Sequence, residues 1–337
     1  MFDTIPTMLN TNTPELTFAI AAVRQASVLV KHIQAEMVSP ALTKDDKSPV
    51  TVADFAAQAL IAKLILDAFP DDPLVAEEDS AALQAPQEEH TLGQVTQFVS
   101  RYLPEAANSS VSAWIDHGAA DPAARFWTLD PIDGTKGFLR GGQYVVALAL
   151  ILDGAVQIAV LGCPNLTAGH IQDLDGPGSV VVAVKGQGAW FVPEDAHTEM
   201  QPLRVSNVQD PASARLLRSF EAAHTNLSQL DRIVAHLGTQ AEPVRLDSQA
   251  KYAILAAGHG DLLFRLISPK APDYKEKIWD QAAGSLVVQE AGGMVTDLDG
   301  RPLDFTRGRT LANNRGVLAS NSSLHAQALQ AIKAVEA

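Results

Sequence analysis

The sequence predicts a chain built in two parts, an α+β part followed by an α/β part. Three observations lead to this prediction. Apolar residues recur at helical spacing near the start, short β-rich segments follow from residue 126, and strands alternate with helices after residue 205. The length of 337 residues is sufficient for two joined cores. We place a boundary near residue 210, which gives an N-terminal domain of residues 1–210 and a C-terminal domain of residues 211–337.

The first part should begin with two helices. Apolar residues recur every three or four positions over 16–37, which predicts an amphipathic helix. A second helix is expected over 51–68, where Thr51 and Asp54 have the spacing of a capping box. A short apolar run at 74–76 then predicts a strand that leads directly into an acidic cluster.

The remaining elements are predicted from the local residue composition and hydrophobic pattern. Residues 81–105 should be irregularly helical, and the segment up to Pro122 reads as a polar, proline-interrupted surface stretch. The β-rich middle should form a mostly antiparallel meander packed on the two early helices. Its expected strands are 126–129, 144–152, 155–162, 180–184 and 189–192. In the second part we expect strands at 216–220, 244–246, 262–266, 294–297 and 317–320, with helices at 227–237, 248–258, 279–291 and 322–335.

Composition narrows the functional classes. The formal net charge is -14, and the only close basic cluster is Lys270, Lys275 and Lys277, so nucleic-acid binding is not indicated. An acidic protein can still take an anionic substrate when bound cations reverse the local charge. The single cysteine, Cys163, excludes an intrachain disulfide and a cysteine-based zinc site.

The same sequence features suggest a location. One cysteine fits a reducing compartment. No apolar stretch looks long and unbroken enough to span a membrane, and the start lacks both a basic, apolar secretory signal and the arginines of a mitochondrial transit peptide. We therefore expect a cytoplasmic protein with no membrane partner.

Four acidic clusters stand at the ends of expected strands or the starts of expected helices. They contain Asp46 in DDKSPVTVAD, Glu77 in VAEED, Asp130 and Asp133 in DPIDGT, and Asp280 in IWDQAAG. Hard divalent cations such as magnesium prefer oxygen ligands, and carboxylates from separate loops can hold two or three of them. Paired metals can activate a water, neutralise phosphate charge and stabilise a leaving oxygen. Together the clusters predict a metal-dependent phosphatase site.

The DPIDGT run contains the largest number of candidate metal- and phosphate-binding groups. Asp130 and Asp133 can face one site, with the carbonyl of Ile132 between them, and Gly134 permits close backbone approach. The N–H groups of Gly134 and Thr135 can bind a phosphate oxygen. Taken singly, the run could be a simple Asx-type turn.

The other acidic residues also have simpler interpretations. Asp280 alone could be a helix cap stabilised by the helix dipole. Glu77 alone could be a solvated residue at a strand end. The metal-site interpretation is favoured over these alternatives only because the clusters occur together.

These motifs in this order resemble the inositol monophosphatase superfamily of lithium-sensitive phosphatases. The resemblance is closer to one branch, the 3'(2'),5'-bisphosphate nucleotidases of the fungal and plant type, and Lys136 after the GT pair favours that branch. It covers roughly residues 20 to 320. The segments that carry it are TKDDKSPVTVADFAAQALI, FPDDPLVAEED, LDPIDGTKGFLRGGQYVVALALI, RLDSQAKYAILAAG and EKIWDQAAGSLVVQEAGGMVTDLDG.

The resemblance implies a layered αβαβα sandwich and magnesium-dependent hydrolysis of adenosine 3',5'-bisphosphate to AMP and phosphate. The related 3'-phosphoadenylyl sulfate would give adenylyl sulfate. It also implies two to three Mg²⁺ ions. Glu77, Asp130 and the carbonyl of Ile132 would hold the first, Asp130, Asp133 and Asp280 the second, and Glu77 with water a looser third. Lithium and sodium should inhibit, because a monovalent ion in a magnesium site supplies too little charge.

The resemblance also assigns the remaining roles. Asp46 and Thr135 match the pair that activates a water for in-line attack on phosphorus. His224, Ser248, Lys251 and Arg265 match positions that contact the nucleotide and its 5'-phosphate, for which a bidentate arginine is well suited.

Each substrate-binding residue also has a simpler interpretation from the sequence alone. His224 could be a surface residue at a helix start, and Ser248 a helix N-cap. Lys251 could lie on a solvated helix face, and Arg265 could be a charge at a strand edge. The sequence leaves these alternatives open.

Two positions differ from the family pattern. Ala76 stands where the family commonly has glycine, and a positive φ there would strain alanine by about 1 kcal/mol. Asp79 stands where a hydroxyl is common, which weakens the prediction of the third metal site.

The expected partner is a small nucleotide, with no nucleic acid, and a monomer is favoured. The alternatives are a phosphatase of inositol phosphates, such as inositol 1,4-bisphosphate or inositol 1-phosphate, and an inactive nucleotide-binding sensor.

Overall fold

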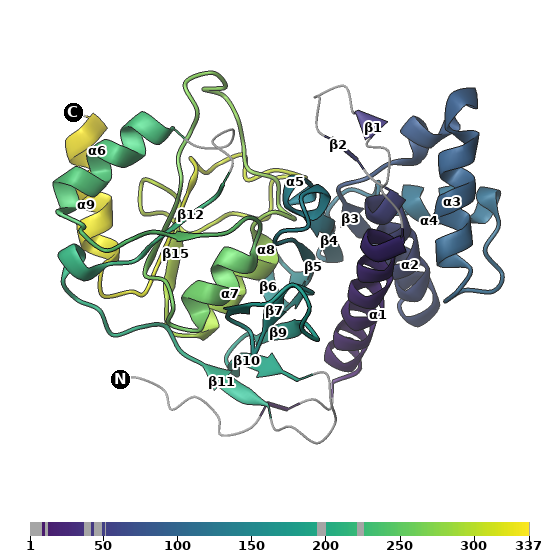
Figure 1. Cartoon of the computed structure of the whole chain (residues 1–337), viewed down its shortest axis with the longest axis horizontal. Helices are drawn as coiled ribbons and strands as arrows, with labels where there is room; N and C mark the ends of the chain where they lie inside the picture. Colours follow the sequence, from purple (N-terminus) through teal and green to yellow (C-terminus); the bar gives the residue numbers. More distant parts are fainter. Residues whose placement is uncertain are drawn as a thin grey trace.

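Five layers of alternating helix and sheet make up the molecule (Figure 1). The structure is a computed structural model, and it describes residues 9–10, 13–36, 42–43, 49–50, 52–193, 200–220 and 226–336. From right to left in Figure 1 the layers are α1 with α2, a seven-stranded sheet, α7 with α8, a five-stranded sheet, and α6 with α9. The expected αβαβα sandwich is confirmed.

The first layer consists of α1 (Pro14–Glu36) and α2 (Val52–Ala68), close to the predicted bounds. In length and apolar composition α1 could cross a membrane, so the expectation that no stretch is apolar enough was wrong. Most of its apolar residues, including Leu16, Val23 and Val30, are buried against α2 and the large sheet, while Val28 is exposed. Such burial is typical of the core helix of a globular domain.

The large sheet separates two of the three apolar cores. Its strands in spatial order are β11 (Gln201–Leu203), β10 (Gly188–Val192), β9 (Ser179–Val184), β6 (Ala155–Cys163), β5 (Val145–Leu152), β4 (Arg125–Asp133) and β3 (Leu74–Ala76). All neighbours are antiparallel except β3 and β4, which run parallel. The antiparallel meander predicted for this region is therefore confirmed. Both faces are covered by helices, so most strands are buried along their length.

A second prediction for this half was also wrong. The segment up to Pro122 was expected to be a polar surface stretch, but it contains α4 (Asn108–Asp116). Val111, Trp114 and Ile115 are its buried residues, and they attach a short helix with a polar first turn to the core. Before it, the irregular helical region consists of the 3₁₀ turns η1 (Ser80–Gln84) and η2 (Pro86–Glu88) and of α3 (Glu89–Val99).

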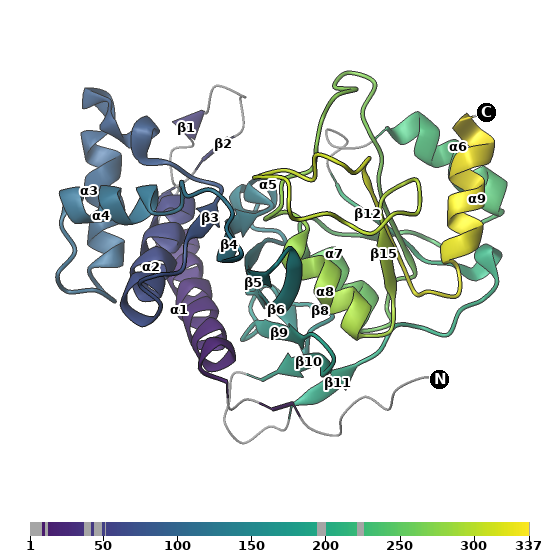
Figure 2. The ribbon, with the colours of Figure 1, turned by 180° about the vertical axis from the view of Figure 1, so that it is seen from behind.

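The middle layer is formed by α7 (Ala250–Ala256) and α8 (Ala282–Glu290), and it belongs to the core between the two sheets. The two helices pack closely, since a Cβ at Gly284 would stand 2.3 Å from the ring of Tyr252. Figure 2 shows this pair from behind, between the large sheet and the strands of the second half.

The second sheet has the order β13 (Val244–Arg245), β12 (Leu216–Arg218), β14 (Leu262–Arg265), β16 (Val317–Ser320) and β15 (Met294–Thr296). It is mixed, since β12 runs parallel to β13 and β14 while β16 is antiparallel to β14 and β15. Its outer face is covered by α6 (Leu227–Leu237) and α9 (His325–Glu336). The predicted boundary near residue 210 falls between β11 and β12, beside the 3₁₀ turn η3 (Pro211–Ser213).

Two small strand pairs and a short helix complete the description. The two-residue strands β1 (Leu42–Thr43) and β2 (Pro49–Val50) pair with each other. A second small pair is formed by β7 (Leu166–Thr167) and β8 (Ile171–Gln172). Between β4 and β5 lies the one-and-a-half-turn helix α5 (Thr135–Leu139). It adjoins the carboxylates of the candidate site.

Candidate active site

A β-bulge at the end of β4 aims two aspartates at one site. Asp130 pairs with Ala147 of β5 and Asp133 with Val145, so two residues of β4 stand opposite one of β5. Residues three apart on a regular strand point to opposite faces of the sheet. The extra residue shifts this alternation by one, so Asp130 and Asp133 share a side. The prediction that they can face one site thus has a structural cause.

The turn after the bulge depends on glycine. Gly134 has a φ of 91°, which is left-handed backbone that residues with a Cβ rarely adopt. A Cβ there would also stand 2.9 Å from the Cβ of Ser248. Ser248 itself has a φ of 67°, and such strain in a residue other than glycine is concentrated at functional sites. The first half of the chain thereby touches the start of α7 directly.

Glu77 is brought beside Asp130 by strand pairing. Ala76 lies opposite Leu129 in the parallel pair of β3 and β4, and the N–H of Glu77 donates to the carbonyl of Leu129 at 3.3 Å. The next residue, Glu78, is held by Gln58 of α2, whose amide both accepts from the Glu78 N–H at 2.9 Å and donates to its carbonyl at 2.6 Å. Buried hydrogen bonds on both sides fix the direction of Glu77.

The difference from the family pattern at Ala76 causes no backbone strain. Ala76 lies in β3 with extended backbone and is not among the residues with positive φ. Its methyl group faces Gly118, where an added Cβ would stand 2.8 Å from that of Ala76. The absence of a side chain at Gly118 therefore accommodates the methyl group. At the other differing position, Asp79 caps η1 by accepting from the N–H of Ala81 at 3.0 Å.

Electrostatics show that the acidic residues act on one another. Burial raises the pKa of the Asp130 carboxyl well above its ordinary value. The surrounding carboxylates raise it further, in the order Glu77, Asp133, Asp280 and Asp54. Burial, opposed by Arg265, also raises the pKa of Asp280, and Asp133 and Glu77 add to that shift. Segments from β3, β4, α2 and the start of α8 thus converge on one acidic site.

Asp133 has compensating contacts that Asp130 lacks. Burial raises its pKa, while the charges of Lys251 and Arg265 and the N–H of Gln249 lower it. That N–H donates to one carboxylate oxygen of Asp133 at 2.6 Å. Asp130, in contrast, has a buried Oδ1 with no hydrogen-bond partner among the described residues. A buried carboxylate oxygen without a donor, surrounded by other carboxylates, fits a divalent cation.

The acidic side chains lie near one another, but their oxygens are not yet arranged to coordinate a metal ion. Within the described ranges, no three acidic, histidine or cysteine side chains are gathered tightly enough to hold a metal ion as they stand. Arg265 lies 3.5 Å from Asp280 and 2.7 Å from the buried Glu276. Mutual repulsion of the carboxylates and the pull of Arg265 both act to keep these oxygens apart, and a divalent cation would oppose both.

Thr135 meets a carboxylate that the sequence argument did not select. Its hydroxyl lies 3.4 Å from the carboxylate of Asp54 and 3.3 Å from the carbonyl of Ile132. Asp54 belongs to the first turn of α2 and is almost fully buried. The residue expected to pair with Thr135, Asp46, lies outside the described residues. A carboxylate in the first turn of a helix whose other residues are nearly all apolar is the sequence signal that could have identified Asp54.

Two of the basic residues expected to bind substrate lie beside the acidic ones, Lys251 buried and Arg265 half-buried. Lys251 is 5% exposed, and its ammonium donates to the hydroxyl of Ser219 at 2.9 Å and the carbonyl of Leu246 at 3.4 Å. Burial lowers its pKa to about 8. The simpler interpretation of Lys251 as a solvated residue is therefore wrong. Arg265 is held by the two acidic residues described above, and its buried Nε has no partner among the described residues. His224 lies outside the described residues.

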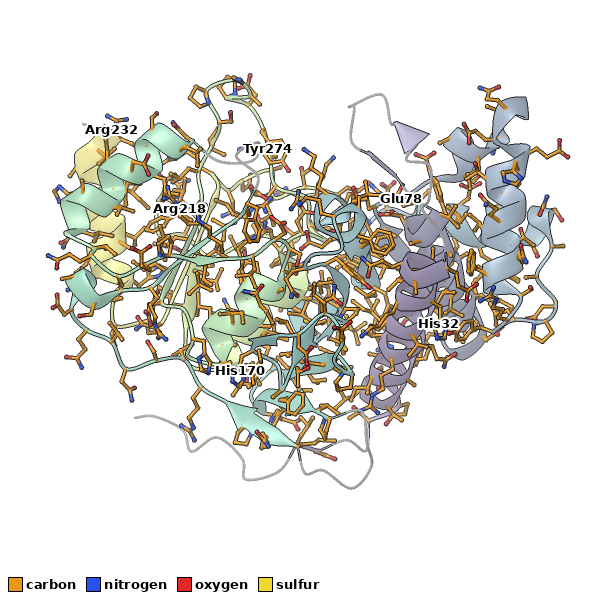
Figure 3. The ribbon with its side chains drawn as sticks, viewed as in Figure 1. His32, Glu78, His170, Arg218, Arg232 and Tyr274 are labelled. Carbon is orange, nitrogen blue, oxygen red and sulfur yellow. The ribbon has the colours of Figure 1, made fainter. Side chains whose placement is uncertain are left out.

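Two further residues at the site were not predicted. Glu276 is a buried partner of Arg265. Tyr274 is acted on by the site's charges, because burial raises the pKa of its hydroxyl and the carboxylates Glu276 and Asp280 raise it further. Figure 3 shows Tyr274 on a loop of the second half and Glu78 on the first half, both toward the upper edge in that view. No local pattern in the sequence distinguishes either residue.

A layered αβαβα core with interacting carboxylates beside Lys251 and Arg265 fits a phosphatase-type hydrolase. A model of the inositol monophosphatase family matches residues 12–337. The chain belongs to the inositol monophosphatase family.

Several curated relatives share one name. The chain is 41% identical to a "3'(2'),5'-bisphosphate nucleotidase" of Schizosaccharomyces pombe, over 95% of this chain and 95% of that protein. Proteins of the same name from Emericella nidulans and Oryza sativa are each 40% identical over 95% of this chain, and over 98% and 93% of their own lengths.

Solved structures agree on the fold. The IMPase of Thermotoga maritima has a TM-score of 0.67 at 22% identity, covering 96% of this chain and 98% of that one. The inositol monophosphatase of Anabaena has a TM-score of 0.61 at 20% identity, covering 95% of each chain. At these identities the similarity concerns the architecture alone.

Proposed function

We propose that the protein hydrolyses the 3'-phosphate of adenosine 3',5'-bisphosphate, giving AMP and phosphate, and converts 3'-phosphoadenylyl sulfate to adenylyl sulfate. One observation carries the choice of substrate. Lys251, which is buried, and Arg265, which is half-buried, lie beside the acidic site, where their charges act on Asp133. A substrate with a second phosphate needs cations beside the place where the first phosphate reacts. The names of the fungal and plant relatives support the same substrate.

Magnesium is the cofactor that suits this set of oxygen donors. Glu77, Asp130 and the Ile132 carbonyl would hold one ion, and Asp130, Asp133 and Asp280 a second, with Glu77 available to a third. The unpartnered Oδ1 of Asp130 is the observation that supports this assignment. Bound there, magnesium supplies positive charge for the phosphate and makes a water more acidic.

The protein's own groups orient the attacking water. When the Thr135 hydroxyl donates to a carboxylate, its oxygen can accept a hydrogen bond from a water, and it can take the water's proton as its own proton passes to the carboxylate. Asp54, 3.4 Å away, is the described carboxylate able to play this part. Asp46 stays the candidate implied by the family resemblance. Hydrogen bonds of this kind often tighten only when substrate is bound.

Substrate is bound from both halves of the chain. The N–H groups of Gly134 and Thr135 would receive oxygens of the reacting phosphate, next to the turn that contacts Ser248. Lys251 and Arg265 would receive the 5'-phosphate, with Ser248 and His224 contacting the nucleotide. Because the pKa of Lys251 is about 8, its ammonium is mostly protonated at neutral pH and can bind an anion.

Phosphate release tests the proposal. It should be measured with adenosine 3',5'-bisphosphate, inositol 1,4-bisphosphate and inositol 1-phosphate, each with and without Mg²⁺. We expect the nucleotide to give by far the largest kcat/KM. Its hydrolysis should require Mg²⁺ and should be inhibited by Li⁺ and Na⁺. Faster turnover of an inositol phosphate would replace the nucleotide by the alternative substrate class. Tight nucleotide binding without phosphate release would instead indicate an inactive sensor.

Two further expectations accompany this proposal. We expect the protein to act as a monomer, which sedimentation equilibrium tests. We also expect it in the cytoplasm, which cell fractionation tests.

A further inference from the structure

Arg309 connects the two halves of the molecule through main-chain groups. It lies in the segment between β15 and β16, which Figure 2 shows running across toward α5 and β4. Its guanidinium donates to the carbonyls of Gly118 at 3.3 Å, Ala120 at 3.1 Å and Ala76. These acceptors belong to the first half of the chain, up to 233 positions away in sequence.

The same residue is also bound to the segment that leads to Asp280. The guanidinium lies 4.9 Å from the ring centre of Trp279, a favourable cation–π distance. The carbonyl of Arg309 accepts from the N–H of Ile278 at 3.2 Å, and its neighbour Thr310 pairs with Lys277 in an antiparallel bridge. Both the main chain and the side chain of Arg309 therefore hold residues 277–279.

The two ends of this connection precede candidate metal ligands on opposite sides of the site. Ala76 comes directly before Glu77, and Trp279 directly before Asp280. Glu77 and Asp280 belong to different halves of the chain, and both act on the buried Asp130. Their separation is thus fixed by the contacts between the halves, and Arg309 makes those contacts next to both residues.

We infer that Arg309 is a positioning residue that holds Glu77 and Asp280 at the separation needed to bind Mg²⁺ between the halves. The inference rests on the proposed metal site. It explains why arginine stands here, because a planar fork can donate to several carbonyls and stack on an indole ring in one placement. A lysine carries a point charge and cannot do both in the same geometry.

The direction in which Mg²⁺ affinity changes when Arg309 is replaced distinguishes a positioning role from a purely electrostatic one. Arg309 is a cation near a site for cations, so the loss of its charge alone should tighten Mg²⁺ binding. Loss of positioning should weaken it. Lys277 provides a matched control, since its ammonium lies 5.6 Å from the same ring of Trp279. The side-chain hydrogen bonds to Ala76, Gly118 and Ala120 come from Arg309.

Isothermal titration of the whole protein with MgCl₂, without substrate, tests the inference. We expect Arg309→Gln to raise the Kd for Mg²⁺ about tenfold or more, with an unchanged far-ultraviolet circular dichroism spectrum. Lys277→Gln should leave the Kd unchanged or lower it. Arg309→Lys, which keeps the charge, should still raise the Kd measurably.

Each result bears on the inference. A Kd for Arg309→Gln equal to or below that of the unaltered protein would overturn it. If Arg309→Gln does not fold, Arg309→Lys decides by the same titration, and an unaltered Kd for that variant would overturn the inference. Absence of Mg²⁺ binding by the unaltered protein would overturn the proposed metal site itself, and the inference with it.

Discussion

The hydroxyl of Thr135 lies 3.4 Å from the carboxylate of Asp54, although the two residues are 81 positions apart in the sequence. The contact joins the turn after β4 to the first turn of α2. Asp54 is buried, and its charge also acts on Asp130. A carboxylate in this position can accept the hydrogen of the threonine hydroxyl. The lone pairs of the hydroxyl oxygen are then free to accept a hydrogen bond from the attacking water.

We expect Asp54→Asn to lower kcat by about 100-fold or more, because general acid–base assistance typically contributes this much. The side chain keeps its size, so substrate affinity should change little. Steady-state kinetics with adenosine 3',5'-bisphosphate at saturating Mg²⁺ measures both quantities. Asp67→Asn, at the exposed end of the same helix, is the control and should be as active as the unaltered protein.

The same assay compares the two candidate carboxylates. If Asp54 assists Thr135, Asp46→Asn should retain much more activity than Asp54→Asn. The reverse order would assign the role to Asp46, as the family resemblance implies. Full activity of the Asp54→Asn protein would rule out the contact with Thr135 as part of the mechanism.

A second prediction concerns the stability of the metal-free protein. Asp130→Asn removes one charge from a buried, mutually repelling group and preserves the shape of the side chain. We expect the free energy of unfolding without Mg²⁺ to rise by about 1–2 kcal/mol, since relief of such repulsion is stabilising. The added stability that Mg²⁺ gives the unaltered protein should be lost.

Urea unfolding with and without Mg²⁺ measures both effects of Asp130→Asn. The unaltered protein should be clearly more stable with Mg²⁺, and the variant equally stable under both conditions. A variant that is less stable without Mg²⁺ would mean that Asp130 has stabilising contacts rather than a repulsive surrounding. A variant still stabilised by Mg²⁺ would exclude Asp130 as a ligand.

The turn after the bulge gives a third prediction. Gly134→Ala places a Cβ on left-handed backbone, 2.9 Å from that of Ser248. We expect a loss of about 2–3 kcal/mol of stability and lower kcat, because the same turn carries Asp133 and Thr135.

Gly93→Ala is the matched control for Gly134→Ala. Gly93 lies inside α3, and a Cβ added there would have no atom within 4 Å, so alanine should stabilise the protein by about 0.5–1 kcal/mol. Thermal unfolding of both variants decides, and equal stabilities would contradict the argument.

Local pattern was sufficient for most elements. The predicted helix 227–237 and strand 317–320 have the bounds found in the structure, because an amphipathic pattern and a short apolar run are each bounded by asparagine and glycine. α4 was missed because its first turn, Asn108 to Ser110, is polar and only three of its residues are buried. Tertiary packing stabilises such a short helix, and propensity alone does not.

Glu77, Asp130, Asp133 and Asp280 could be selected as candidates because three short motifs carry them, whereas Asp54 and Glu276 were missed. The arrangement of these side chains could not be predicted, since it depends on a bulge in β4 and on Ser248 in a strained backbone conformation. The contact of Asp54 with Thr135 and the connections of Arg309 join residues far apart in sequence. A single sequence contains no local signal for such pairs.

The last prediction concerns His325, at the start of α9, whose ring is buried between two hydroxyls. Thr296 donates its proton to the carbonyl of Asp297 at 2.8 Å, so its oxygen accepts from Nε2–H of His325 at 2.9 Å. Nδ1 then accepts from Ser320 at 2.8 Å, which favours the neutral ring. Burial lowers the pKa of His325 to about 4 from 6.5.

The unfolded chain therefore binds a proton at His325 between pH 6.5 and 4 that the folded protein does not. This contribution to stability is fully present above pH 6.5, falls as the pH decreases, and amounts to at most about 3 kcal/mol. His325→Gln lacks the titrating group but can form both hydrogen bonds. Urea unfolding from about pH 7.5 to about pH 4.5 should show a steeper loss of stability for the unaltered protein than for His325→Gln. Parallel curves would mean that the folded protein protonates His325 as readily as the unfolded chain, and that the ring is not held neutral by its two hydroxyl partners.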